Sequence, residues 1–114
     1  MDYYKILNSL KKCWSEKSSE NWSEENPSRG QCSVTAIVIQ DNFGGDIVKT
    51  LSKEGQWHYY NRINGISYDF TSDQFPEPLL YFDLPSNKIE ALSDTSMEQY
   101  KYLSDKFRMN QIEL

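Results

Sequence analysis

The sequence predicts an α+β fold in which a buried central helix packs on a small antiparallel sheet, with further helices at the N- and C-terminal ends. Three observations predict it. The stretch from Gly30 to Gly45 has an apolar arc that closes almost to a full ring before Gln40, and it ends in a glycine pair. Two strand-like runs are joined by Asn64-Gly65, the strongest short signal for a β-hairpin. Apolar residues recur at spacings of three and four near both ends of the chain. At 114 residues, the chain is expected to form one domain over residues 1–114.

The two terminal helices are predicted from apolar stripes. The first runs from Asp2 to about Trp14, and Cys13 continues its stripe, so this cysteine is expected in the core. The last runs from about Thr95 to Gln111. Between the first helix and the central one, residues 15–29 show no helical or strand period and read as a polar loop.

The central helix begins near Cys32. Ala36, Ile39 and Phe43 share a face with this cysteine, at spacings of four, three and four. Val34, Ile37 and Val38 widen the apolar arc almost to a full ring, which is typical of a helix buried on most sides.

Three strands are predicted after that helix, over Asp46–Leu51, Trp57–Ile63 and Ile66–Phe70. A two-residue loop at Asn64-Gly65 fixes the pairing of the last two. Because side chains alternate along a strand, His58 and Asp69 then lie on one face as diagonal neighbours, about 7–8 Å apart at the backbone. Asn61 points to the opposite face. Beyond these strands, residues 71–75 resemble a capped turn, and three prolines break the segment that follows.

Composition narrows the classes of partner. The net charge of −5 disfavours nucleic acid as a partner, and basic patches for a membrane surface are lacking. Neither a signal peptide nor a membrane-spanning run is visible. Cys13 and Cys32 are therefore expected as free thiols in a cytoplasmic protein, monomeric or homodimeric. One histidine and two separated cysteines predict no metal site, and we expect no cofactor.

The chemistry of Cys32 depends on its position. A thiol at a helix N-terminus faces unpaired amide N–H groups and the positive end of the helix dipole, both of which favour the thiolate. The same N–H groups can stabilise an oxyanion. With His58 as general base and Asp69 orienting it, Cys32 becomes a predicted catalytic nucleophile acting on a small-molecule or peptide substrate.

Three further residues are predicted to bind substrate. Gln31 could add a side-chain donor for the oxyanion, because it directly precedes Cys32. Trp22 stands alone as an aromatic residue in a polar loop and could line a cleft. Tyr60 lies on the predicted sheet face of His58 and Asp69.

A second interpretation comes from another class of protein. Cysteine is among the most buried residue types, and Cys32 lies on the apolar stripe of the central helix. A lone histidine on a strand is more often structural than catalytic. On this interpretation the protein is a non-catalytic binding or interaction protein, and Cys32, His58 and Asp69 belong to the core.

Several motifs resemble the small bacterial YunG-like proteins, whose family name implies no activity. The resemblance covers about half the chain, from Trp22 to Phe75, and rests on these runs: Asn26-Pro27, Gly30-Gln31-Cys32-Ser33-Val34-Thr35-Ala36, Gln40-Asp41-Asn42-Phe43-Gly44-Gly45-Asp46-Ile47, His58-Tyr59-Tyr60-Asn61-Arg62-Ile63, Asp69-Phe70-Thr71 and Gln74-Phe75.

The order Cys, His, Asp also resembles the transglutaminase-like branch of papain-like folds. That resemblance implies a helix packed on an antiparallel sheet and a cysteine hydrolase or acyltransferase acting on an amide, ester or thioester. By position, Cys32 would be the nucleophile, His58 the base and Asp69 the orienting residue. The papain pattern places a glutamine a few residues before the nucleophile, whereas Gln31 is directly adjacent and Asn26 is further back.

Overall fold

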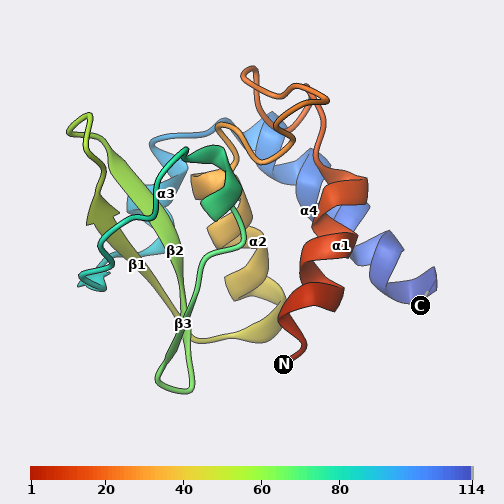
Figure 1. The fold of residues 1–114 in the computed structure, drawn as a ribbon. Coiled ribbons are helices and arrows are strands. Elements are labelled where there is room, and N and C mark those ends of the chain that lie inside the picture. Colours follow the sequence, from red (N-terminus) through yellow and green to blue (C-terminus); the bar gives the residue numbers. More distant parts are fainter. Residues whose placement is uncertain (114) are drawn as a thin grey trace.

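The computed structural model describes residues 1–113 and confirms the α+β class. Over that range it contains four helices and a four-stranded antiparallel sheet with strand order β3-β2-β1-β4 (Figure 1). The elements in chain order are α1 (Tyr3–Cys13), α2 (Cys32–Phe43), β1 (Asp46–Leu51), β2 (Trp57–Ile63), β3 (Ile66–Tyr68), the 3-10 helix η1 (Ser72–Gln74), β4 (Leu84–Pro85), α3 (Lys88–Leu92) and α4 (Met97–Glu113).

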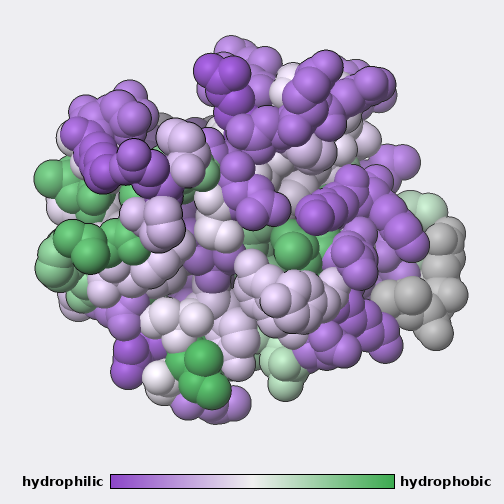
Figure 2. All heavy atoms as spheres, viewed as in Figure 1, coloured by the Kyte–Doolittle hydropathy of each residue, from purple (hydrophilic) through white to green (hydrophobic). Residues whose placement is uncertain are grey.

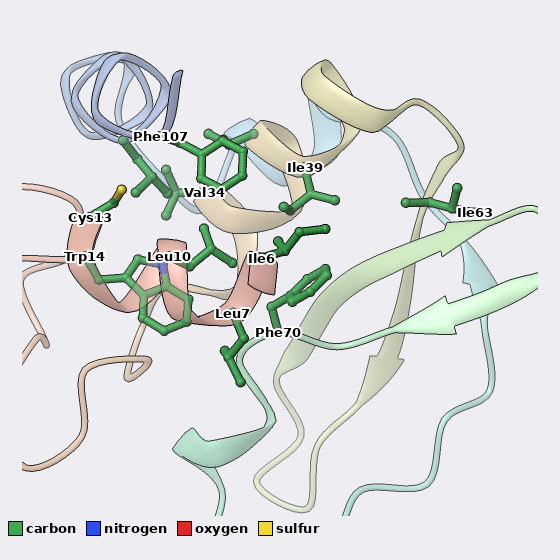
Figure 3. Close-up of a cluster of buried hydrophobic side chains, with 12 residues drawn as sticks. Ile6, Leu7, Leu10, Cys13, Trp14, Val34, Ile39, Ile63, Phe70 and Phe107 are labelled. Atoms are coloured by element: carbon green, nitrogen blue, oxygen red, sulfur yellow. The ribbon is translucent and has the colours of Figure 1, made fainter. Parts of the chain in front are cut away.

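Helix α2 lies between the sheet on one side and helices α1 and α4 on the other (Figure 1). Toward the sheet, Ala36 and Ile37 pack in a cluster with Ile47 of β1 and Tyr59 of β2. Toward the helices, α2 contributes to the larger apolar cluster of Figure 3. The buried residues of this cluster are Ile6, Leu7, Leu10, Cys13, Trp14, Val34, Val38, Ile39, Ile63, Phe70, Leu103 and Phe107. The prediction of a helix buried on most sides is confirmed, and so is the core position of Cys13.

Helix α1 matches the prediction to within one residue at each end. Asp2 caps its N-terminus by accepting a hydrogen bond from the backbone N–H of Lys5. At its C-terminus, the indole Nε1 of Trp14 donates to the Thr35 hydroxyl of α2 at 2.9 Å. Because both partners are buried, this bond fixes α1 against the start of α2.

The hairpin has the predicted register, with Asn61 opposite Tyr68 and Ile63 opposite Ile66. Asn64 and Gly65 both have positive φ, +52° and +79°, as a type I′ turn requires. Strands β1 and β2 have the predicted bounds. Strand β3 is shorter than predicted and ends at Tyr68 instead of residue 70.

The early end of β3 has a local cause. The carboxylate of Asp69 accepts hydrogen bonds from the backbone N–H and the hydroxyl of Thr71, which turns the chain away from the sheet. Phe70 then enters the large apolar cluster, and η1 follows where a capped turn was predicted.

The proline-broken segment contains two short elements that the sequence did not predict. Strand β4 pairs with the outer edge of β1, where proline is tolerated because its missing N–H faces away from the ladder. Helix α3 is only five residues long, too short to show a period, and is capped by Asn87. The chain before β4 crosses the sheet face opposite α2, where Thr50 donates to the carbonyl of Leu80 and accepts from the N–H of Phe82 (Figure 1).

The face seen in Figure 2 is mostly hydrophilic and carries several separate apolar patches. Among residues 1–113, no helix combines the length and the apolar character that crossing a bilayer demands.

Candidate active site

Cys32 is the first residue of α2, and the backbone that leads into it at Gly30 is sterically constrained. Gly30 has φ of +73°, and a Cβ built on it would stand 2.4 Å from the hydroxyl oxygen of Ser19, so only glycine fits there. Gln31 is the N-cap residue but makes no side-chain cap bond within the described chain. The half-buried Cys32 therefore stands beside first-turn N–H groups that no N-cap side chain satisfies.

His58 and Asp69 form the predicted diagonal pair. The imidazole Nε2 lies 2.7 Å from Oδ2 of Asp69, and both side chains are buried. The same Oδ2 accepts from the Tyr81 hydroxyl at 2.7 Å, and Oδ1 accepts from the N–H and hydroxyl of Thr71. Four donors thus fix the orientation of the carboxylate, which in turn fixes the imidazole.

The imidazole of His58 retains one free nitrogen. Phe75 contacts the ring edge-on with centroids 4.8 Å apart, and Tyr60 stacks on it at 6.0 Å. Nδ1 is buried, and among the described side chains, residues 1–111, none forms a hydrogen bond of normal geometry with it. The Cys32 side chain is the group that interacts with the ring from this side of the molecule. Because Nε2 donates its proton to Asp69, Nδ1 is the nitrogen left to accept or deliver a proton.

The charge of His58 follows from three effects. Burial lowers the pKa of the imidazole, but the hydrogen bonding and the charges of Asp69 and of Cys32 raise it, and the result is a pKa of about 9. At neutral pH the ring is therefore an imidazolium. The second cysteine differs, because burial raises the pKa of the Cys13 thiol to about 11 and keeps it protonated.

Cys32 and His58 both lie in the wall of one cavity of about 600 Å³. The wall combines the start of α2, the β1–β2 turn, the start of β2, η1 and the end of α3, contributed by Gly30, Cys32, Ser33, Ser52, Gly55, Gln56, Trp57, His58, Tyr59, Gln74, Phe75, Glu90, Ser93 and Asp94. The face of His58 and Asp69 thus meets the start of the central helix. Asp69 supports His58 from behind the wall.

The three predicted substrate-binding residues lie elsewhere. Gln31 is fully buried, and its amide Nε2 donates to the carbonyl of Ser15 at 3.4 Å. Trp22 packs against the large apolar cluster. Tyr60 lines a separate cavity of about 310 Å³, and its hydroxyl bonds to the Asp83 carboxylate at 2.7 Å. The structure thus brings Cys32, His58 and Asp69 together but leaves these three outside the shared cavity.

Two residues of the site had no signal in the sequence analysis. Tyr81 lies in the proline-broken segment, and no strand pairing predicted from the sequence fixes the path of this segment over the sheet. Phe75 follows η1 and reaches the imidazole only through tertiary packing. Because side chains alternate along β2, Tyr59 and His58 leave the strand on opposite faces, and nothing in the sequence indicates that both line the same cavity.

The described residues offer no set of side chains suited to binding a metal ion. No group of three or more His, Cys, Asp or Glu side chains among residues 1–113 could hold a metal ion.

Comparison with known proteins identifies the family. A family model described as YunG protein matches residues 2–111. The chain is 53% identical over 114 residues to "Uncharacterized protein YunG" of Bacillus subtilis (strain 168), an alignment that covers 98% of this chain and 96% of that protein. No solved structure matches the chain. With a near-complete family match and this identity, the chain belongs to the YunG family.

Proposed function

We propose that this protein is a cysteine-dependent hydrolase or acyltransferase acting on an amide, ester or thioester. Cys32 is the nucleophile, His58 the general acid and base, and Asp69 the orienting residue, in a single domain with a papain-like or transglutaminase-like core. One observation carries the proposal: a buried imidazole, bound through Nε2 to a carboxylate, lies with Nδ1 unpaired in a cavity wall that it shares with a cysteine at a helix N-terminus.

The proposed reaction has two stages. The Cys32 thiolate attacks the carbonyl carbon, an S–C bond forms, and the carbonyl electron pair moves to oxygen. When that oxyanion collapses, the bond to the leaving group breaks and Nδ1–H of His58 gives its proton to the departing nitrogen, oxygen or sulfur. Nδ1 then takes a proton from water or an acceptor amine as it attacks the thioester. Cys32 leaves as thiolate, and the imidazolium is restored.

Burial and charge favour this role over a purely structural one. Buried polar atoms are normally hydrogen-bonded, and an unpaired buried atom in a native structure calls for an explanation. For His58 Nδ1, a catalytic role supplies that explanation, because a substrate or the Cys32 thiol would provide the missing hydrogen-bond partner. The surroundings of the two cysteines also favour a catalytic role for Cys32. Cys13 is enclosed by core side chains, whereas Cys32 is half-buried in the wall of a cavity.

Alkylation by iodoacetamide, followed at each cysteine by peptide mass spectrometry, tests the proposal. Cys32 should react at neutral pH at least about tenfold faster than Cys13, whose thiol stays protonated and enclosed. His58→Gln should slow the alkylation of Cys32 by about tenfold or more, because the acid–base partner beside the thiol is lost. Cys13 is the internal control in every sample.

Two outcomes would contradict the proposal. One is Cys32 alkylation as slow as that of Cys13, and the other is a Cys32 rate that His58→Gln leaves unchanged. Either result would favour the non-catalytic interpretation. If Cys32 behaves as expected, profiling with cysteine-directed amide, ester and thioester acyl probes, using Cys32→Ser as the blank, would identify the class of leaving group.

A further inference from the structure

The proposed reaction needs a hydrogen-bond donor for the oxyanion, and the side chain predicted for that task lies elsewhere. Gln31 is fully buried and turned toward the carbonyl of Ser15. The first-turn N–H groups of α2 can serve one side of the carbonyl oxygen. A second donor has to come from another part of the cavity wall, to which the start of β2 contributes.

Tyr59 stands at that wall. Only 3% of the residue is exposed, and its ring packs in the cluster of Ala36 and Ile37, against which Cys32 also packs. Among the described side chains, residues 1–111, its hydroxyl has no hydrogen-bond partner, and no hydrogen bond contributes to its pKa. The hydroxyls of four other tyrosines are all bonded to backbone or carboxylate oxygens; these are Tyr3, Tyr60, Tyr81 and Tyr100. Tyr59 is thus an almost fully buried tyrosine that lines the cavity holding Cys32.

The electrostatic surroundings keep this hydroxyl protonated. Burial, followed by the nearby Asp94, Glu90 and Cys32, raises the pKa of Tyr59 to about 12. At neutral pH the group is a phenol, able to donate a hydrogen bond to an anionic oxygen.

Strand alternation explains how one short segment serves both sides of Cys32. His58 and Tyr59 are consecutive, so their side chains leave β2 on opposite faces. Both nevertheless line the same cavity, which therefore wraps around the start of the strand. A carbonyl held at Cys32 would have the imidazole on one side and the phenol on the other.

We propose that the Tyr59 hydroxyl donates a hydrogen bond to the oxyanion formed when Cys32 attacks a carbonyl, and that it is a catalytic residue. The inference rests on the proposed function, since it requires Cys32 to form an acyl-enzyme. It assigns to Tyr59 and the α2 N–H groups together the role first predicted for Gln31.

Two reactions of Cys32 separate this role from thiol activation. Acylation by p-nitrophenyl acetate forms an S–C bond, passes through a tetrahedral oxyanion and releases p-nitrophenolate. Alkylation by iodoacetamide forms an S–C bond and releases iodide without an oxyanion. Both rates are measured on the full chain for the wild type, Tyr59→Phe and a matched control, Tyr68→Phe, whose half-buried ring lies outside the cavity of Cys32.

Tyr59→Phe should slow acylation by about tenfold or more, since loss of one oxyanion donor typically costs about a hundred- to a thousandfold. Its alkylation rate should stay within about twofold of the wild type, and Tyr68→Phe should change neither rate. Equal slowing of both reactions, or no change in acylation, would overturn the role of Tyr59 alone. If the wild type alkylates rapidly at Cys32 but forms no acyl-enzyme, the proposed function fails and this role fails with it.

Discussion

The buried pair of His58 and Asp69 makes stability depend on pH in a direction that the structure fixes. The pKa of His58 is about 9 in the folded protein, against 6.5 for an ordinary histidine. The folded state therefore holds this proton more tightly than the unfolded state does. The stabilisation is fully present below pH 6.5 and is lost as the pH rises through 9.

The magnitude follows from the same two values. Each pH unit between folded and unfolded pKa corresponds to about 1.4 kcal/mol, so the interval from 6.5 to about 9 corresponds to about 3 kcal/mol. Solvent screening removes little of it, because the histidine and aspartate side chains are only 2% and 8% exposed. A loss of this size is a large fraction of the stability of a small domain.

Urea unfolding at intervals from pH 6 to pH 9.5, in the wild type and His58→Gln, measures this loss. The wild type should lose about 3 kcal/mol more than the variant, which cannot titrate at this position. Cys13 also disfavours the folded state at high pH, because its raised pKa leaves it protonated where the unfolded thiol ionises. Both proteins carry Cys13, so the comparison cancels its effect. Parallel pH profiles in the two proteins would refute the assignment of an imidazolium at His58.

Two further substitutions test how the site is held. Gly30→Ala should lower the free energy of unfolding in urea by at least about 2 kcal/mol, since it combines a strained positive φ with a Cβ 2.4 Å from Ser19. Gly65→Ala has a similar φ but open space around the Cβ, so it should lower that free energy by about 1 kcal/mol. Equal costs would show that the contact with Ser19 relaxes freely. Tyr81→Phe removes a donor to Asp69 and should cost about 1 kcal/mol, less than a fully buried charged hydrogen bond because Tyr81 is partly exposed. A change too small to measure would mean that water replaces the hydroxyl.

Much of the fold could be predicted because local chemistry decides it. The apolar ring of α2 leaves no polar face for solvent, so burial between two layers follows directly. Asn64-Gly65 adopts the only common two-residue turn that accepts positive φ at both positions, and this turn fixed the register of β2 against β3. The pairing of His58 with Asp69 followed from that register.

The segments that could not be predicted depend on distant contacts. Strand β4 exists because the edge of β1 offers unpaired backbone groups to a passing chain, and two residues carry no periodic signal. Helix α3 is held by its packing on α2 and by the Asn87 cap. The path over the outer face depends on Thr50, whose hydroxyl gives no hint in the sequence that it bonds to Leu80.

The substrate-binding residues show where reasoning from position along the chain stops. Adjacency to Cys32 suggested Gln31 as a donor, but successive residues at a helix N-terminus point in different directions, and this side chain turned into the core. The face shared with His58 suggested Tyr60, yet that face is divided by the crossing chain, and Asp83 holds the Tyr60 hydroxyl.

The meeting of Cys32 with His58 has a physical origin in the shortness of β3. His58 lies at the start of β2, and β3 ends opposite Asn61, so the β3-side edge of β2 is unpaired at His58. An unpaired edge leaves room for η1 and the start of α2 to approach, and Gly30 is tied to η1 by its N–H bond to the Gln74 side chain. Asp69 contributes to this arrangement in two ways. Its carboxylate ends β3 by accepting a hydrogen bond from the Thr71 N–H, and it also binds His58. Asp69→Ala should therefore disturb both the position of the loop and the charge of the imidazole, whereas Asp69→Asn, whose Oδ1 can still accept from Thr71, should keep the loop in place and remove the charge and the acceptor that hold His58.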